Sequence, residues 1–507
     1  MPASVAREGG SGARERIFER SVEDLQRELE CGTLTSEDLV RYFLARIRVY
    51  DGAVNSIITE NPLALDEARR LDRERKAGKI RGPLHGIPIV LKDNYDTRDM
   101  ETTSGALAFK GLRPKKDAFV VSKLRSAGAI FIGKANLTEL ARNGMTVSSM
   151  GGQTLNPYDL TRTPGGSSGG TGAAVAMNFA VAGTGSDTVN SIRSPSSANS
   201  LVGIRATRGL VSRHGISPSS DWQDLAGPIA RTVADAALLL SVMAGYDPED
   251  RSTEALRGRA PEDYTKYLRE GAFRGKRIAL LTRCVGEDPD VTRVVREAVR
   301  DISSLGATVV EADIPEFDLA ALREKNDVQL WEQVPGLDRY LAEKGGLAPV
   351  KSTREYFETG LMTPCIVDEF REMLAVERPL EQPEYRARLE RNKRLREFVT
   401  RYMAEHGVDA FLYPLQSVLA VRTDDPLGQH DRNGLMASVA GLPAVDLPGG
   451  FSRPSSTAPI GVPIGIEFMA EPFSEPKLVS LAYSFEQATR HRRPPAGFPD
   501  LDFSSAG

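Results

Sequence analysis

Ser191 lies in a short segment of small residues, GTGSDTVNSIRSP (residues 183–195), and could act as a nucleophile. A serine hydroxyl attacks a carbonyl carbon only when a base removes its proton. None of the five histidines of the chain lies in this segment, and the nearest, His214, comes well after it. If Ser191 is a nucleophile, its base must come from another part of the chain.

The densest run of small residues, TPGGSSGGTGAA (163–174), allows three interpretations. A phosphate-binding P-loop would need a lysine in this run, and there is none. A nucleophile elbow, GxSxG, matches around Ser167 and around Ser168, and would need a downstream acid and then a histidine such as His430 or His491. In the third interpretation, the glycines hold a serine in an unusual backbone conformation that serves a nucleophile elsewhere. A flexible linker is disfavoured because apolar segments flank the run.

Lys92 ends the segment GPLHGIPIVLK (82–92), which predicts a short apolar strand. Burial disfavours the charged form of a lysine and lowers its pKa, and a neutral amine is a base. A lysine at a strand end more often reaches solvent. Its interpretation as a base therefore depends on its occurring together with the two serine segments.

The elements that would position these residues alternate between helix and strand. We expect a helix over 35–50 in which Thr35 and Asp38 form the N-cap, and a helix over 232–244 whose cap Asp235 completes. Such alternation predicts an α/β fold. The other expected helices are 118–127, 171–182, 289–304 and 475–488, and the other expected strands are 129–133, 275–282, 307–313, 409–414 and 461–470.

Composition and charge limit the class of protein. The chain has 507 residues, 65 of them basic and 69 acidic, and its net charge of −4 gives no sign of nucleic-acid or membrane binding. Its three cysteines are far apart and form no CxxC pair, which favours the cytoplasm. The histidines form no HExxH or similar cluster, so we expect no metal and no cofactor.

We expect a single large domain over residues 21–497. Residues 1–20 are charged and glycine-rich, which predicts a disordered lead-in rather than a signal peptide. Residues 498–507 form a C-terminal tail. The helix-rich, strongly charged region 316–408 is expected to form a wall of the substrate pocket.

The order and spacing of Lys92, Ser167 and Ser191 resemble those of the amidase signature family of serine hydrolases. Matching segments span roughly residues 20–495 in the family's order. The resemblance implies a large mixed, twisted β-sheet covered by α-helices on both faces. Besides the segments quoted above, the matches are HGIPIVLKDN (85–94), KANLTELARNGMT (134–146), GQTLNPYD (152–159), AGPIARTVADAALLL (226–240), GLPAVDLPGGF (441–451) and GVPIGIEFMAEPFSE (461–475).

The resemblance also implies a role for each residue. Ser191 would be the nucleophile, Ser167 would relay a proton from a cis peptide, and Lys92 would be the base. Backbone N–H groups would form the oxyanion hole, and these belong to Thr188, Val189, Asn190 and Ser191. Supporting positions would be Ser168, Asp187 and Arg193, and positions in contact with the substrate would be Gly144 and Met145.

Val189 and Asn190 stand where most members of this family have two glycines. Backbone donors do not require glycine, so the oxyanion hole can survive this change. Valine resists a positive φ, whereas asparagine tolerates it. We therefore expect a negative φ at Val189, and we expect any left-handed conformation to fall on Asn190.

These features predict a hydrolase of C–N bonds in a small carboxamide, anilide or carbamate, including an aryl acylamidase or a urethanase, acting as a monomer or homodimer. One alternative is the A-type subunit of a glutamine-dependent amidotransferase, which works with partner subunits. Another is a catalytically inactive scaffold or binding protein, which the intact Lys92, Ser167 and Ser191 disfavour. The last is a Ser-His-Asp hydrolase that uses Ser168.

Overall fold

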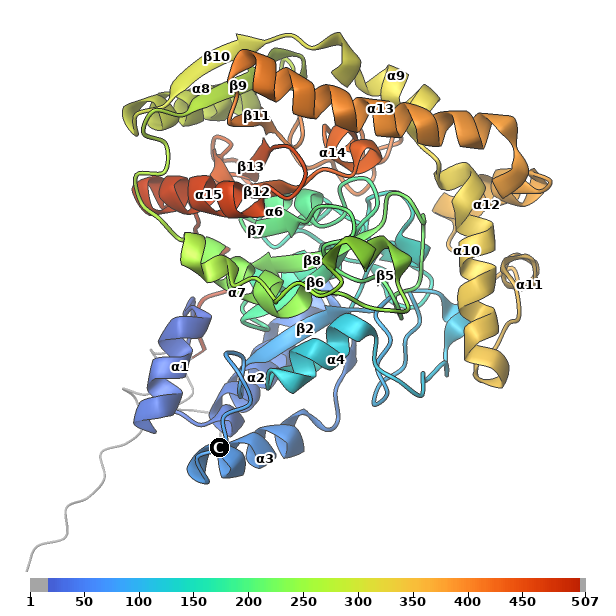
Figure 1. Ribbon diagram of the computed structural model, residues 1–507. Coiled ribbons are helices and arrows are strands. Elements are labelled where there is room, and N and C mark those ends of the chain that lie inside the picture. The colour runs from blue at the N-terminus through green and yellow to red at the C-terminus, as the bar shows by residue number, and fades with distance from the viewer. Residues whose placement is uncertain (1–16, 502–507) are drawn as a thin grey trace, which may run out of the picture.

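An eleven-stranded mixed β-sheet forms the centre of the computed structural model, which describes residues 17–501 (Figure 1). The strand order is β1-β3-β2-β6-β8-β7-β12-β13-β11-β9-β10. Strand β2 runs parallel to β3 and β6, and β9 runs parallel to β10 and β11, whereas the other neighbours are antiparallel. The strands of this sheet are Ile57–Glu60 (β1), Pro88–Lys92 (β2), Ile130–Ala135 (β3), Ala182–Asp187 (β6), Val202–Arg205 (β7), Leu225–Ala230 (β8), Arg277–Leu281 (β9), Thr308–Ala312 (β10), Ala410–Pro414 (β11), Ala444–Phe451 (β12) and Pro463–Met469 (β13).

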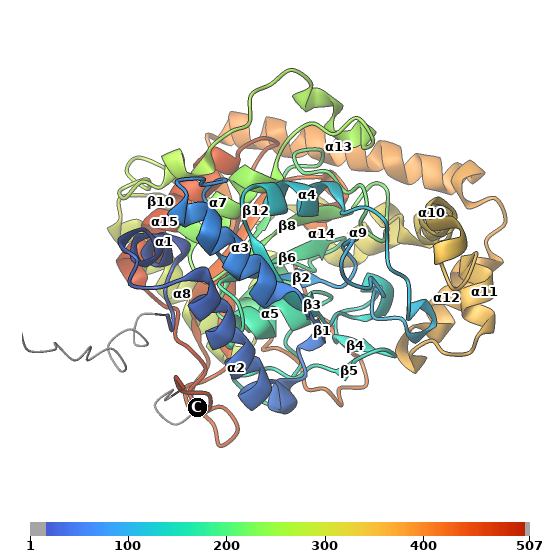
Figure 2. The same cartoon turned by 90° about the horizontal axis from the view of Figure 1, so that it is seen from below.

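Helices cover both faces of this sheet. Figure 2 shows α4 and α7 on one side of it and α2 and α5 on the other. The α/β class and the mixed sheet predicted above are confirmed. The helices are Val22–Cys31 (α1), Ser36–Val54 (α2), Ala64–Lys76 (α3), Phe119–Ser126 (α4), Gly169–Ala176 (α5), Arg193–Ala198 (α6), Val233–Met243 (α7), Pro289–Ser304 (α8), Leu319–Asn326 (α9), Gln329–Lys344 (α10), Thr353–Glu358 (α11), Val367–Ala375 (α12), Pro383–His406 (α13), Leu435–Ala440 (α14) and Glu475–Thr489 (α15); a separate two-stranded ribbon joins Val147–Ser148 (β4) and Gly152–Gln153 (β5).

The predicted caps had different outcomes. Thr35 and Asp38 form the expected capping box at the start of α2. Thr232 also caps α7 by accepting from the Asp235 N–H, but the Asp235 carboxylate does not complete a box. It accepts instead from the Val22 N–H at 2.8 Å. Asp235 therefore ties α7 to the start of α1, so the prediction that it completes the cap is wrong.

Strand β6 carries the first part of the Ser191 segment, and no pattern in the sequence predicted it. Its sequence, AGTGSD, lacks the β-branched and aromatic residues that favour strands, apart from one threonine. All six residues are buried, and the strand pairs with β2 on one side and β8 on the other. Its position in the sheet places the end of β6 beside the end of β2, where Lys92 lies.

The region 316–408 folds into α9 to α13, as expected from its composition. Figure 1 shows α10, α11 and α12 beside the sheet, in yellow and orange at the right. A hydrophobic cluster of their own holds α10 to α12 against residues 106–112, and Leu337, Tyr356 and Phe370 belong to it. This region is therefore anchored beside the carboxyl end of β2.

Both ends of the chain extend partly beyond the described residues. The lead-in expected over 1–20 falls outside them as far as residue 16. Residues 17–20 are part of the fold, because Ile17 is buried and the Glu19 carboxylate binds Arg492 at 2.7 Å. Of the expected tail, residues 502–507 also lie outside, whereas Asp500 accepts from the Tyr42 hydroxyl at 2.6 Å. Within residues 17–501, no helix has the length and apolar character needed to cross a membrane.

Candidate active site

Lys92 is the last residue of β2, and its side chain is completely buried. Its Nζ lies 2.8 Å from Ser167 Oγ and 2.8 Å from Ser186 Oγ. Asn94 Nδ2 also donates to Ser186 Oγ, at 3.0 Å. The lysine amine is therefore held between two serine hydroxyls at the carboxyl ends of β2 and β6.

Burial lowers the pKa of the Lys92 amine to about 7. Asp224 and Asp187 oppose this shift because their negative charges favour the protonated form. Within residues 17–501, no carboxylate lies close enough to Lys92 to form an ion pair. At neutral pH, about half of the molecules therefore carry the unprotonated amine that a base requires.

Ser167 lies in the loop that precedes α5. The peptide bond between Gly166 and Ser167 is cis, as the family resemblance implied. The Ser167 carbonyl accepts from the Thr138 N–H at 3.0 Å. Its neighbour Ser168 donates through its backbone N–H to the Ser191 carbonyl at 3.2 Å, and through its hydroxyl to the Ser186 carbonyl at 3.3 Å. Ser168 therefore joins the two serine loops, which is the supporting position expected for it.

Ser191 lies between the end of β6 and the start of α6, and only 4% of it is exposed. It lines the large cavity described below. Among the described residues, its Oγ has no hydrogen-bond partner, and no hydrogen bond joins it to Ser167. The structure therefore brings the three predicted residues into one site, with a direct bond only between Lys92 and Ser167.

The backbone N–H groups of Thr188, Val189, Asn190 and Ser191 have no acceptor within residues 17–501. Their carbonyls are held from the opposite side. Gln223 Nε2 donates to the Thr188 carbonyl at 3.3 Å, and Arg193 Nη2 donates to the Val189 carbonyl at 2.6 Å. In a trans peptide the N–H points away from the preceding carbonyl, so these contacts leave the N–H groups of Val189 and Asn190 free.

A buried network of charges supports this loop. Arg193 Nε lies 3.1 Å from Asp187 Oδ2, and its Nη1 lies 2.6 Å from Glu467 Oε1. Arg205 Nη1 approaches Asp187 from another direction, at 2.6 Å. Because both arginines attract its charged form, the pKa of Asp187 is held well below its usual range. The ion pair between Arg193 and Asp187, two of the positions expected to support the loop, is completely buried, and Arg193 also holds the Val189 carbonyl of the loop.

Neither Val189 nor Asn190 has a positive φ. The prediction for Val189 is confirmed, and Asn190 does not adopt the left-handed conformation that was open to it. Its side chain has another contact, because Asn190 Oδ1 accepts from Arg432 Nη1 at 3.0 Å. The asparagine thus connects the Ser191 loop to the guanidinium of Arg432, which lines the cavity described next.

The large cavity beside Ser191 has a volume of about 910 Å³. Of the two positions predicted to contact the substrate, Met145 lines this cavity, whereas Gly144 is not part of its lining. Helices α9, α10, α12 and α13 contribute one wall, which includes Trp331, and Cys365 also lines the cavity. Helices of the region 316–408 therefore line this cavity, and the role of that region as a wall of the substrate pocket stays a prediction.

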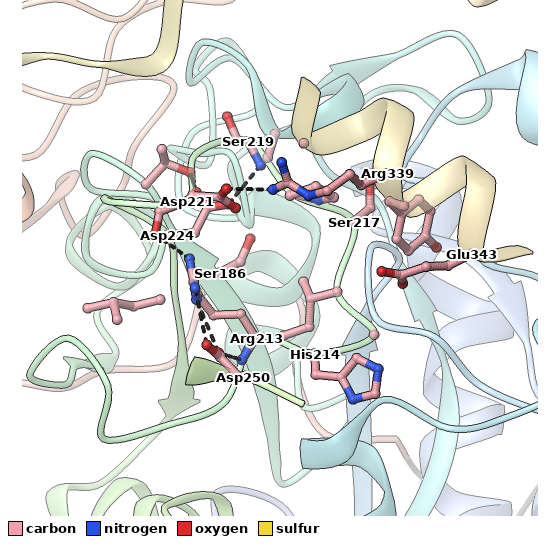
Figure 3. A pocket seen from close by; sticks show the side chains of 18 of the residues that line it. Ser186, Arg213, His214, Ser217, Ser219, Asp221, Asp224, Asp250, Arg339 and Glu343 are labelled. Carbon is pink, nitrogen blue, oxygen red and sulfur yellow. Dashed lines mark hydrogen bonds and ion pairs between the residues drawn. The ribbon is translucent and has the colours of Figure 1, made fainter. Parts of the chain in front are cut away.

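A smaller cavity, of about 160 Å³, is lined by Ser186 (Figure 3). Its lining mixes polar and apolar residues, and it includes the ion pairs of Arg213 with Asp250 and of Arg339 with Asp221. Thr188 lines both cavities. Ser186, which accepts from the Lys92 amine, therefore also borders this second cavity.

Three residues of this site were not predicted from the sequence, namely Ser186, Asn94 and Arg432. Ser186 lies in the quoted segment 183–195, and Asn94 lies two residues after Lys92, so their closeness to the predicted residues was the available signal. Arg432 had no such signal, because only folding brings it to Asn190.

The alternative that uses Ser168 with a histidine finds no support in the geometry. Within residues 17–501, no histidine forms a hydrogen bond with Ser167, Ser168 or Ser191. His430 binds Asp431 and Asp425, and His491 lies 3.9 Å from Asp301. In the same residues, no group of three or more His, Cys, Asp or Glu side chains is arranged to hold a metal ion.

Comparisons with known proteins agree with this geometry. A family model described as Amidase matches residues 38–479. The chain is 37% identical to the peptide amidase from Stenotrophomonas maltophilia, with a TM-score of 0.85 and coverage of 94% of this chain and 98% of that one.

Amidotransferase subunits are also similar to this chain. It is 35% identical over 475 residues to the A-type subunit of the glutamyl-tRNA(Gln) amidotransferase of Moorella thermoacetica, covering 91% of this chain and 95% of the relative. The structure of the corresponding subunit from Thermotoga maritima is 26% identical, with a TM-score of 0.71 and coverage of 95% and 97%. The chain therefore belongs to the amidase family, and hydrolysis of an amide C–N bond is the activity that this membership supports.

Proposed function

We propose that the chain hydrolyses an amide-type C–N bond through an acyl-enzyme on Ser191. The observation that carries this proposal is the buried Lys92 amine, which lies 2.8 Å from Ser167 Oγ and forms no ion pair with any residue of 17–501. A lysine in such surroundings is a base at neutral pH, with a pKa of about 7. The serine loops bring Ser191 next to this pair through the bond from the Ser168 N–H to the Ser191 carbonyl.

In the first step, neutral Lys92 takes the proton of Ser167 as Ser167 takes the proton of Ser191. Ser191 Oγ then forms a bond to the carbonyl carbon, and the carbonyl oxygen becomes an oxyanion. When a substrate binds, Ser191 Oγ must come within hydrogen-bond distance of Ser167 Oγ, as catalytic hydrogen bonds often do only in the substrate complex.

The free N–H groups of residues 188–191 are the donors proposed for the oxyanion. They are positioned before the reaction, because the carbonyls of the same loop are held by Gln223, Arg193 and Ser438. Such preorganised donors stabilise the charge that develops on the carbonyl oxygen.

Collapse of the intermediate breaks the C–N bond, and the proton held by Lys92 returns through Ser167 to the leaving amine. Water then attacks the acyl-enzyme by the same relay, which releases the carboxylic acid and restores Ser191. Ser186, held by Lys92 and Asn94, is proposed to keep the amine directed toward Ser167.

The proposed substrates are small carboxamides, anilides and carbamates, including urethanes. The similarity to the peptide amidase named above supports the hydrolysis of amides. We further propose that the protein acts in the cytoplasm without partner subunits, and its three free cysteines favour that compartment. The second candidate function is that of an amidotransferase A-type subunit, and its support is the identity of about one third to such subunits over nearly the full length.

The test uses the purified full chain without any other protein. It is assayed with a 4-nitroanilide, a primary amide and a carbamate, and treated with a fluorophosphonate that is located by peptide mass spectrometry. We expect release of the amine product in the wild type, none in Ser191→Ala, and a label at Ser191. Hydrolysis retained in Ser191→Ala would refute the mechanism, and hydrolysis only in the presence of partner subunits would favour the amidotransferase.

A further inference from the structure

Arg432 lies on the segment between β11 and α14, and its side chain lines the large cavity. Its Nη1 donates to Asn190 Oδ1 at 3.0 Å, and Asn190 directly precedes Ser191. Consecutive Cα atoms are about 3.8 Å apart, so the guanidinium contacts the residue directly adjacent to the proposed nucleophile. Within residues 17–501, Arg432 forms no ion pair.

The backbone around Arg432 is shaped to receive its side chain. A Cβ atom at Gly144 would lie 2.3 Å from Arg432 Nη1, so the space that a side chain would fill at position 144 is taken by the guanidinium. A Cβ atom at Gly434 would lie 2.6 Å from Asn190 Cβ. Two glycines on separate segments thus make room for Arg432 and for the asparagine that it contacts.

The other arginines of the cavity differ from Arg432 in their contacts. Arg142 forms an ion pair with Glu369. The guanidinium of Arg388 lies over the ring of Trp331, 4.5 Å from its centroid. Arg323 also has no ion pair within residues 17–501, but it is exposed at the surface and its positive charge repels that of Arg432.

The acidic residues of the cavity do not neutralise Arg432. Asp327 accepts from the backbone and side chain of Gln329, and Asp425 lies 3.6 Å from His430 Nε2. Glu372 is exposed on α12. A half-buried guanidinium without a negative partner is unfavourable, because burying a charge has a large cost unless it is paired. An anion bound in the cavity would remove this cost.

Resting on the hydrolase function proposed above, we propose that Arg432 binds a carboxylate carried by the substrate. The enzyme then acts preferentially on amides that bear a carboxylate on a short chain near the scissile carbonyl. Asn190 positions the guanidinium through the contact with Nη1, which leaves the remaining N–H groups of Arg432 for the two carboxylate oxygens. Arginine suits this role because its planar group donates to both oxygens of a carboxylate at once.

The test compares two pairs of 4-nitroanilides that differ only in charge. Succinic mono-4-nitroanilide is paired with its neutral branched isostere, 4-methylpentanoic 4-nitroanilide, and glutaric mono-4-nitroanilide is paired with the 5-methylhexanoic compound. We expect the wild type to prefer the carboxylate of at least one pair by about 10- to 100-fold in kcat/KM, the range of a charge-assisted hydrogen bond. In Arg432→Gln this preference should disappear, mainly through a higher KM for the carboxylate substrate.

Two further variants separate binding from structural support. Arg432→Lys retains the charge but not the two-pronged geometry, so it should retain part of the preference. It also provides a second variant if Arg432→Gln does not fold. Arg323→Gln removes the exposed unpaired arginine of the same cavity, and it should reduce the preference less than Arg432→Gln does.

The results can also overturn the proposal. Equal kcat/KM values within both pairs in the wild type would do so, as would a preference that survives in Arg432→Gln. An equal loss in Arg323→Gln would mean that the cavity attracts anions in general and that Arg432 makes no specific contact. If the wild type cleaves the neutral anilides without preference, only this inference fails. If it cleaves none of the four but hydrolyses another substrate of the hydrolase test above, again only this inference fails. If it hydrolyses none of all these substrates, the proposed hydrolase function fails with it.

Discussion

Replacing Lys92 by methionine tests whether the lowered pKa of this lysine makes the stability of the folded protein depend on pH. In the folded chain this pKa is about 7, compared with its ordinary value of 10.5. Between these two values the unfolded chain holds a proton that the folded chain has lost. Stability therefore rises with pH in this window, and it does not depend on this group below about pH 7, where both states are protonated. Methionine has a similar shape and no proton to lose, so Lys92→Met lacks this dependence.

The magnitude follows from the two pKa values. A difference of one pKa unit corresponds to about 1.4 kcal/mol, so the difference between the folded and unfolded pKa values corresponds to about 5 kcal/mol. This is the largest destabilisation that the buried amine can cause. Between pH 6 and pH 9 the wild type should recover about 2.5 to 3 kcal/mol relative to Lys92→Met. At an unfolding entropy of about 2.1 cal/mol/K per residue, this corresponds to a change of about 2 to 3 °C in the difference between their Tm values.

The assay is thermal unfolding of wild type, Lys92→Met and Ser191→Ala at pH 6, 7, 8 and 9. Ser191→Ala is the matched control, because it removes the nucleophile but retains Lys92, so its curve should run parallel to that of the wild type. The hydrogen bonds that Lys92→Met loses to Ser167 and Ser186 involve hydroxyls that do not titrate in this range, so the loss of these partners adds no pH dependence of its own. A Tm difference between wild type and Lys92→Met that is the same at every pH would refute the reasoning.

Three further predictions concern the same site. Because the proposed reaction needs the neutral amine, kcat/KM should rise with pH through about 7 and fall about tenfold per pH unit below pH 6. A pH profile of kcat/KM that is flat from about pH 5.5 to 8.5 would contradict the role proposed for Lys92. Ser167→Ala should lower kcat by about 10²- to 10⁴-fold, whereas Ser168→Ala, which loses only a 3.3 Å hydrogen bond, should lower kcat less than tenfold. Equal losses of kcat in steady-state assays would contradict the proton relay proposed for Ser167. Arg193→Met should lower the free energy of unfolding by about 3 to 5 kcal/mol in urea denaturation, because Glu467 loses its arginine partner and Asp187 loses one of its two arginine partners. A change below about 1 kcal/mol would contradict the importance of this buried network for stability.

Much of the fold was predictable because its signals are local. The apolar stripe and capping box of α2, and the strand-helix-strand pattern of β9, α8 and β10, are properties of neighbouring residues. Strand β6 was not predictable in this way. Its small residues show no alternation, and the strand forms because β2 and β8 pair with it on both sides.

The roles expected for the site residues came from the resemblance to a family, whereas the chemistry of these residues depends on their surroundings in the fold. Lys92, Ser167 and Ser191 could be selected from the sequence because they occur in three recognisable segments. The role of base proposed for the Lys92 amine depends on the fold, because the folded protein removes this amine from water and, within residues 17–501, no carboxylate lies at ion-pair distance from it. The sequence alone does not show that this lysine is buried.

The sequence by itself determined the residue types that can react and most of the helices and strands that carry them. Only the tertiary structure decided which side chains meet. Ser186 reaches Lys92 because β6 lies beside β2, and Arg432 reaches Asn190 across 242 positions of the chain. Such contacts depend on the packing of distant segments, and the spaces left by Gly144 and Gly434 become visible only when those segments are together.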